Sequence, residues 1–115
     1  MLNTLKVEPL EPLLAEDFIY ESQNVFQPLV SKQAFLDYIG PKLKTIARLD
    51  SSVYAEMGSI AAYGEQQPCV ILAQDDIENL VGLVLVKVEG DKIKRFDLCI
   101  VPPPQSAQRT GDYPA

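Results

Sequence analysis

The segment that most constrains this fold is residues 80–88, LVGLVLVKV, where apolar side chains occupy both alternating sets of positions. A strand with one face in water alternates apolar and polar residues, so this strand needs cover on both faces. The sequence offers one substantial helix, which covers one face only. We therefore expect a second copy of the chain to cover the outer face, which predicts a homodimer.

Four β-rich segments follow one another in the second half of the chain, at residues 53–62, 69–75, 80–89 and 92–101. Turn-forming residues separate them, including the tight Gly90-Asp91 pair before the last segment. This order predicts an antiparallel meander. Residues 18–23, FIYESQ, alternate in the same way and predict a further strand near the start of the chain.

The main helix is predicted to begin after Ser31, a residue type that caps helix N-termini. The apolar residues after it recur at helical spacing and share one face: Phe35, Ile39, Leu43 and Ile46. Pro41 interrupts the pattern and removes one backbone hydrogen bond, so we expect a kink or two abutting helices.

The rest of the chain is less patterned. Residues 9–16 predict a short lead-in helix, and residues 102–115 form a proline-rich tail that cannot continue a sheet. Because Tyr113 lies beyond three consecutive prolines, we hypothesise that this tail caps a cavity or holds a partner chain. Together the elements predict one α+β domain over residues 1–115, with a curved antiparallel sheet wrapped around the main helix.

Composition disfavours several classes of protein. The net charge is −6 and the ten basic residues are scattered, whereas nucleic acids and anionic membranes require a basic patch. No signal peptide or membrane-spanning stretch is visible, so we expect a cytoplasmic protein. The chain has no histidine, and Cys69 and Cys99 should lie too far apart to bond. We therefore expect no disulfide, metal or cofactor.

Three stretches carry a resemblance to a known superfamily: LLAEDFIYESQ at residues 13–23, VSKQAFLDYIGPKLKTI at 30–46, and VEGDKIKRFDLCIVPP at 88–103. They resemble a helix leading into a first strand, the main helix, and the last hairpin of the nuclear-transport-factor-two-like superfamily. This superfamily is also called the cystatin-like or ketosteroid-isomerase-like cone and includes the SnoaL-like cyclases. Ser31 replaces the glycine usual there, and the long first helix of the family is shortened to residues 9–16.

The resemblance implies a cone-shaped cavity between sheet and helix and, often, a dimer. It also implies a choice among isomerases, dehydratases, cyclases and proteins without known activity, which the fold alone does not make. At the positions that match the carboxylates of steroid isomerases, this chain has Ser22 and Val84. The helix that carries the family's tyrosine is largely absent, so isomerase chemistry of that type is disfavoured.

The last strand carries the strongest candidate site. Arg95, Asp97 and Cys99 share one face of it, and if that face lines the cavity, Asp97 would serve as a base or acceptor with Arg95 as its charge partner. Tyr20 and Tyr38 are candidate acid–base partners or ligand contacts. The alternative is an ion pair between Arg95 and Asp97 and tyrosines that simply pack. The complete predicted ligand set is Tyr20, Phe35, Tyr38, Arg95, Asp97 and Cys99.

Alternation places Glu21 and Glu56 away from the cavity, so both are expected to face solvent. Three functions remain open. The leading one is binding of a small apolar molecule between helix and sheet. The alternatives are a SnoaL-like cyclase, dehydratase or isomerase without a cofactor, which would use Asp97 with Tyr20 or Tyr38, and a protein-interaction module that dimerises through the sheet.

Overall fold

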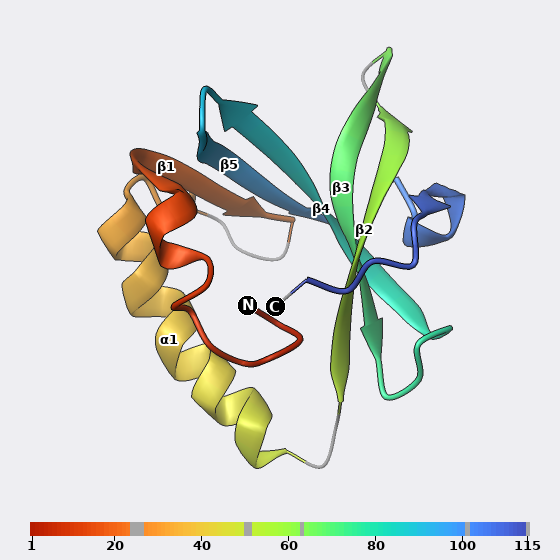
Figure 1. Ribbon diagram of the computed structural model, residues 1–115, viewed down its shortest axis with the longest axis horizontal. Coiled ribbons are helices and arrows are strands. Elements are labelled where there is room, and N and C mark those ends of the chain that lie inside the picture. Colours follow the sequence, from red (N-terminus) through yellow and green to blue (C-terminus); the bar gives the residue numbers. More distant parts are fainter. Residues whose placement is uncertain (24–26, 50–51, 63, 101, 115) are drawn as a thin grey trace.

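The computed structural model describes residues 1–23, 27–49, 52–62, 64–100 and 102–114. One helix packs against a curved six-stranded sheet that does not close into a barrel (Figure 1). The elements are α1 (Lys32–Arg48), β1 (Leu14–Ser22), β2 (Val53–Ala62), β3 (Glu65–Gln74), β4 (Leu80–Glu89), β5 (Lys92–Cys99) and β6 (Gln108–Arg109), with 3₁₀ turns η1 (Glu11–Leu13) and η2 (Pro104–Ser106).

The strand order is β1-β5-β4-β3-β2-β6, which confirms the antiparallel meander from β2 to β5. The sheet is mixed rather than wholly antiparallel, because β1 pairs with β5 in parallel. In this register Tyr20 lies opposite Phe96, and Glu21 lies opposite Asp97. Since β4 occupies one edge of β5, β1 completes the backbone hydrogen bonding of the other edge.

Of the two outcomes expected at Pro41, a kink or two abutting helices, the second was wrong, because α1 is one continuous helix. Ser31 caps it as expected, because its Oγ accepts a hydrogen bond from the Ala34 amide at 3.0 Å. Pro41 lies on the exposed side of the helix, opposite the buried residues Phe35, Ile39 and Leu43. Packing of this buried face against the sheet outweighs the one hydrogen bond that the proline removes.

The core between α1 and the inner face of the sheet is aromatic. Phe18 and Phe35 are almost fully buried, and their ring centroids lie 5.0 Å apart in an edge-on arrangement. Phe96 contacts Phe18 at 5.1 Å, and Tyr20 contacts Phe35 at 5.2 Å. These contacts fix β1, β5 and the start of α1 as one unit.

A second apolar cluster lies on the outer face of the sheet and consists of Ile60, Cys69, Ile71, Leu83, Leu85 and Cys99. The C-terminal tail packs there through Ala107 and the buried Pro104. Part of the cover that the apolar segment of β4 requires therefore comes from the chain itself. Cys69 and Cys99 are buried, and neither is in a disulfide.

The N-terminal segment contains less helix than the predicted span 9–16, because only η1 is helical there and β1 begins at Leu14. The two chain ends lie close together in front of the sheet (Figure 1). Asn3 joins them, since its Nδ2 donates to the carbonyl oxygen of Pro114 at 2.6 Å. None of the described helices is long and apolar enough to span a membrane.

Gly58 on β2 is required where the tail crosses the sheet. A Cβ atom at this position would lie 2.5 Å from the Gln108 carbonyl oxygen and 2.7 Å from the Ile71 side chain. We expect Gly58→Ala to displace the tail and to lower the free energy of unfolding by about 1–3 kcal/mol. Gly40→Ala in α1 is the control, because a Cβ there meets nothing within 4 Å. Urea denaturation checks both variants, and equal losses in the two would contradict the assignment.

Tyr20 makes the stability of the fold sensitive to alkali. Burial, with the neighbouring Tyr38, raises the pKa of Tyr20 to about 12 from its ordinary value of 10.0. The neutral phenol is thus favoured in the folded state, and its stabilisation is complete below pH 10 and lost as the pH rises toward 12. Tyr20→Phe should flatten this alkaline loss in denaturation curves, and an alkaline loss as steep as that of the parent protein would contradict the assignment.

Candidate functional site

The predicted site residues fall on two opposite faces of the sheet. Tyr20 and Phe35 belong to the inner aromatic core, and the ring of Tyr38 lies 5.7 Å from that of Tyr20. Phe96 pairs with Tyr20 on the inner face, and the next residue, Asp97, pairs with Glu21. Because successive side chains of a strand point to opposite faces, Arg95 and Asp97 project from the outer face. The structure therefore does not bring Asp97 together with either tyrosine.

On the inner face of the sheet, Tyr20 belongs to the apolar core and Tyr38 packs against that core. Tyr20 is 8% exposed and Phe35 is 1% exposed. The Tyr38 hydroxyl accepts a hydrogen bond from Lys42 Nζ at 2.9 Å at the surface of α1. Neither tyrosine lines the two pockets described below. The catalytic role of Tyr20 and Tyr38 stays a prediction, and Asp97, their predicted acid–base partner, lies on the opposite face of the sheet.

On the outer side, Arg95 forms a charged cluster with two carboxylates. Its Nε donates to both carboxylate oxygens of Asp97 at 3.0 Å, and its Nη2 donates to Glu21. These hydrogen bonds, with that from Asp97 foremost, raise the pKa of Arg95. The ion pair that the sequence offered as the alternative to a catalytic Asp97 is therefore present.

This cluster lines an outer groove of about 550 Å³, which contains Glu21, Ser22, Gln23, Gln67, Leu85, Lys87, Arg95, Asp97, Leu98 and Cys99. Burial, followed by the charge of Asp97, raises the pKa of the Cys99 thiol. A thiol held in its protonated form is a weak nucleophile. The groove thus offers charge recognition and no activated nucleophile among its described residues.

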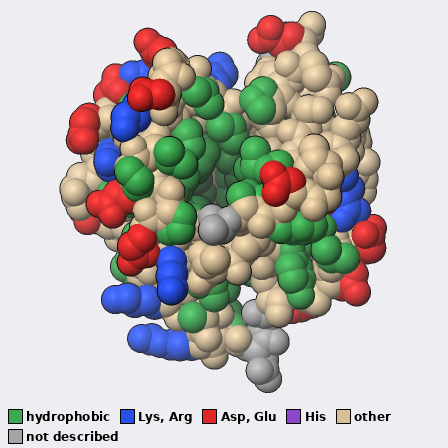
Figure 2. Space-filling model, in the orientation of Figure 1, with side chains coloured by type: hydrophobic (Ala, Val, Ile, Leu, Met, Phe, Trp, Pro, Cys, Tyr) green, Lys and Arg blue, Asp and Glu red, His purple; other side chains and the backbone are tan. Residues whose placement is uncertain are grey.

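A second pocket, here called the apolar pocket, has a volume of about 520 Å³ and is bordered by the N-terminal segment, the end of α1, the start of β2, the turn after β3 and the C-terminal tail. It is lined by Leu2, Asn3, Leu5, Ile46, Ser52, Val53, Tyr54, Ile77 and Tyr113. Ile46 comes from the last turn of α1, Val53 begins β2, and Tyr113 belongs to the C-terminal tail. Hydrophobic side chains gather in hollows on the molecular face that carries both chain ends (Figure 2).

Polar contacts hold the pocket walls in place. Asn3 binds the edge of β2 like a short strand, since its Oδ1 accepts from the Ala55 amide at 2.9 Å and its Nδ2 donates to the Ala55 carbonyl at 2.8 Å. Glu56, expected in solvent, is instead 4% exposed and hydrogen bonded to Arg109. That expectation was wrong, because residues of the tail cover the outer side of β2.

Most residues of the apolar pocket were not predicted from the sequence. Its only signal was Tyr113, which prompted the hypothesis of a tail that caps a cavity and which does line the pocket. Leu2 and Leu5 lie in a segment without a regular apolar period, so no pattern assigned them a face. In the described part of the chain, no three metal-ligating side chains gather closely enough to hold a metal ion.

Comparison with known proteins identifies the architecture. No family model and no curated protein matches this chain by sequence. Among solved structures, the chain is similar to a protein assigned as a polyketide cyclase from Sinorhizobium meliloti. The identity is 10%, the TM-score is 0.57, and the match covers 84% of each chain.

Two further solved structures are similar to this chain over most of its length. An LEH-like epoxide hydrolase from Mycobacterium tuberculosis matches at 13% identity and a TM-score of 0.54, covering 84% of this chain and 68% of the other. An NTF2-like protein with a cystatin-like fold from Novosphingobium aromaticivorans matches at 11% identity and a TM-score of 0.55, covering 89% and 73%. At such identities the likeness concerns the fold alone. The chain therefore has the cystatin-like cone fold of nuclear-transport-factor-two-like proteins, as its sequence pattern indicated.

Proposed function

We propose that the apolar pocket binds a small, largely apolar and uncharged molecule. The observation that carries this proposal is the composition of the pocket wall, which combines aliphatic side chains of the N-terminal segment, α1 and β2 with the rings of Tyr54 and Tyr113. Pockets of a few hundred Å³ with apolar walls and few polar groups are typical of sites for small molecules. Burial of apolar surface would supply most of the affinity.

The polar groups of the wall support an uncharged ligand. Among the described lining residues there is no Lys, Arg, Asp or Glu. The Asn3 amide is already engaged by Ala55 and Pro114. Among the described lining residues, the remaining polar side-chain groups are the hydroxyls of Ser52, Tyr54 and Tyr113. A charged ligand would lose its hydration without gaining a partner, which is costly.

The enzymatic alternative finds less support. A cyclase, dehydratase or isomerase without a cofactor needs an acid–base pair that reaches its substrate. Asp97 lies in the outer groove, on the opposite side of the sheet from Tyr20 and Tyr38. The part of the apolar pocket that the structure describes has two tyrosines and no carboxylate in its lining. The similarity to a cyclase and an epoxide hydrolase therefore supports a shared shape of fold rather than a shared reaction.

The predicted homodimer and the cytoplasmic location stay predictions. The tail already covers part of the outer face of the sheet, which leaves the region around the outer groove for a second copy. A dimer through that region should have a solution mass of twice 12.7 kDa. Size-exclusion chromatography with light scattering checks this, and a monomer at millimolar concentration would exclude it.

A variant that fills the pocket tests the proposed function. Ser52 is exposed at the pocket rim, so Ser52→Trp should place an indole in the cavity without disturbing the core. With the neutral probe N-phenyl-1-naphthylamine, we expect binding to weaken by about tenfold or more, equivalent to about 1.4 kcal/mol. Gln33→Trp, on the exposed side of α1 and away from the pocket, is the matched control.

Fluorescence titration gives the affinities, and native mass spectrometry of the purified protein looks for a retained molecule. Equal probe affinity in Ser52→Trp and in the parent protein would place the probe elsewhere and would contradict the proposal. Failure of the parent protein to bind any neutral apolar probe would contradict it as well.

A further inference from the structure

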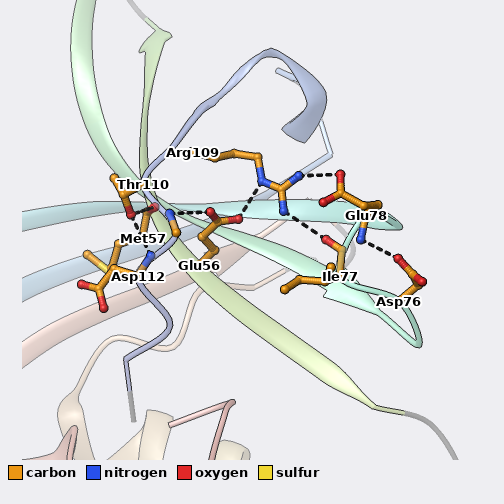
Figure 3. Close-up of polar contacts among 9 residues, drawn as sticks. Glu56, Met57, Asp76, Ile77, Glu78, Arg109, Thr110 and Asp112 are labelled. Atoms are coloured by element: carbon orange, nitrogen blue, oxygen red, sulfur yellow. Dashed lines mark hydrogen bonds and ion pairs between the residues drawn. The ribbon is translucent and has the colours of Figure 1, made fainter.

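The C-terminal residues 108–114, here called the strap, run along the exposed edge of β2 (Figure 3). Gln108 and Arg109 pair with Ser59 and Gly58 as β6. Beyond them, the Met57 amide donates to the Asp112 carbonyl at 2.8 Å, and Thr110 Oγ1 donates to the Met57 carbonyl at 2.6 Å. The strap thereby completes the hydrogen bonding of an edge strand that would otherwise be open.

A buried carboxylate fastens the strap. The Glu56 side chain is 6% exposed, and each of its oxygens accepts a hydrogen bond from the strap, one from Arg109 Nε and one from the Gly111 amide, both at 2.7 Å. Burial alone would raise the pKa of Glu56, but the hydrogen bonds from Arg109 and Gly111 outweigh it and hold the pKa below its ordinary value. The carboxylate is therefore ionised and satisfied by strap atoms.

Arg109 extends this contact to the wall of the apolar pocket. Its Nη1 donates to Glu78 Oε2 at 2.9 Å, and its Nη2 donates to the Ile77 carbonyl at 3.2 Å (Figure 3). Ile77 lines the apolar pocket from the turn between β3 and β4. A single guanidinium thus joins β2 to the turn that supplies one pocket wall.

Tyr113 links the same ion pair to another wall. Tyr113 lines the apolar pocket, and the two strap residues before it are held on β2: the Gly111 amide donates to Glu56, and the Asp112 carbonyl accepts from the Met57 amide. The opposite end of the strap is held by Asn3, a further lining residue, through the Pro114 carbonyl. Two pocket walls therefore depend on the ion pair, whereas Ile46 on α1 contributes a wall that does not.

We propose that Glu56 and Arg109 are positioning residues that set the width of the apolar pocket, and thereby the size of the ligand it accepts. This inference rests on the proposed function of the pocket. The ion pair contacts no ligand; it acts by fixing Ile77 and Tyr113 at a constant separation from the helix wall. Removing the ion pair leaves the wall at Ile46 in place and loosens the walls formed by Ile77 and Tyr113.

The relative affinity for a larger and a smaller probe distinguishes a positioning role of the ion pair from a general effect on the stability of the protein. For Arg109→Ala and for Glu56→Gln, we expect the affinity ratio between N-phenyl-1-naphthylamine and the smaller 1-naphthol to shift at least about fivefold in favour of the larger probe. A mere loss of folded protein would weaken both probes equally and leave the ratio unchanged. Lys94→Ala is the matched control, because it removes the ion pair with Asp17 between β5 and β1, and neither residue lines the apolar pocket.

A measurement without ligand tests the inference independently. Methyl NMR should show shifted and broadened Ile77 signals in both variants, with Ile46 signals unchanged. Where Arg109→Ala fails to fold, the double variant Glu56→Gln, Arg109→Gln removes both charges together and avoids a buried unpaired carboxylate. An unchanged probe ratio with unchanged Ile77 signals would overturn the inference. Absence of probe binding in the parent protein, with Ile77 still shifted in the variants, would overturn the proposed function alone.

Discussion

The pairing of the C-terminal strap with the edge of β2 is the interaction on which the rest of this small structure depends. The sheet is apolar on both faces along β4, and a chain of this length has one helix with which to cover them. The helix and its aromatic contacts cover the inner face. On the outer face the chain turns back after β5, packs Pro104 and Ala107 on the second cluster, and continues as the strap. One segment thus covers apolar surface and pairs the open edge at once.

The helix and strands that could be predicted from the sequence are those whose apolar residues repeat at a regular spacing along the segment itself. The spacing of Phe35, Ile39 and Leu43 predicted the buried face of α1, and the alternating segments predicted the meander. The parallel pairing of β1 with β5 was not predicted, because no local pattern records which distant strand a segment joins. That register decides the candidate site, since it places Tyr20 beside Phe96 and Glu21 beside Asp97. Alternation then puts the predicted base and the predicted tyrosines on opposite faces.

Glu56 illustrates a second limit of local patterns. Alternation placed Glu56 on the face away from the cavity, and exposure was expected because glutamate side chains on such a face usually meet water. The cover comes from Arg109 and Gly111, residues more than fifty positions away in a tail without strand character. The lining residues Leu2 and Leu5 were missed for the same reason. Their roles arise from where the two chain ends meet, and no period in the sequence encodes that meeting.

A carboxylate at a buried edge position also restricts what else can pair with β2. If an apolar side chain replaced Glu56, the Gly111 amide and Arg109 Nε would lose their acceptor. The edge of β2 would still offer unpaired backbone groups to any other β-forming segment. With Glu56 present, a competing strand must bring a cation and a backbone donor to the same place or else bury an unpaired charge, which is strongly unfavourable. The ion pair therefore contributes to specificity as well as to attachment. It selects the chain's own tail for the edge of β2, and by doing so it brings Tyr113 to the wall of the apolar pocket.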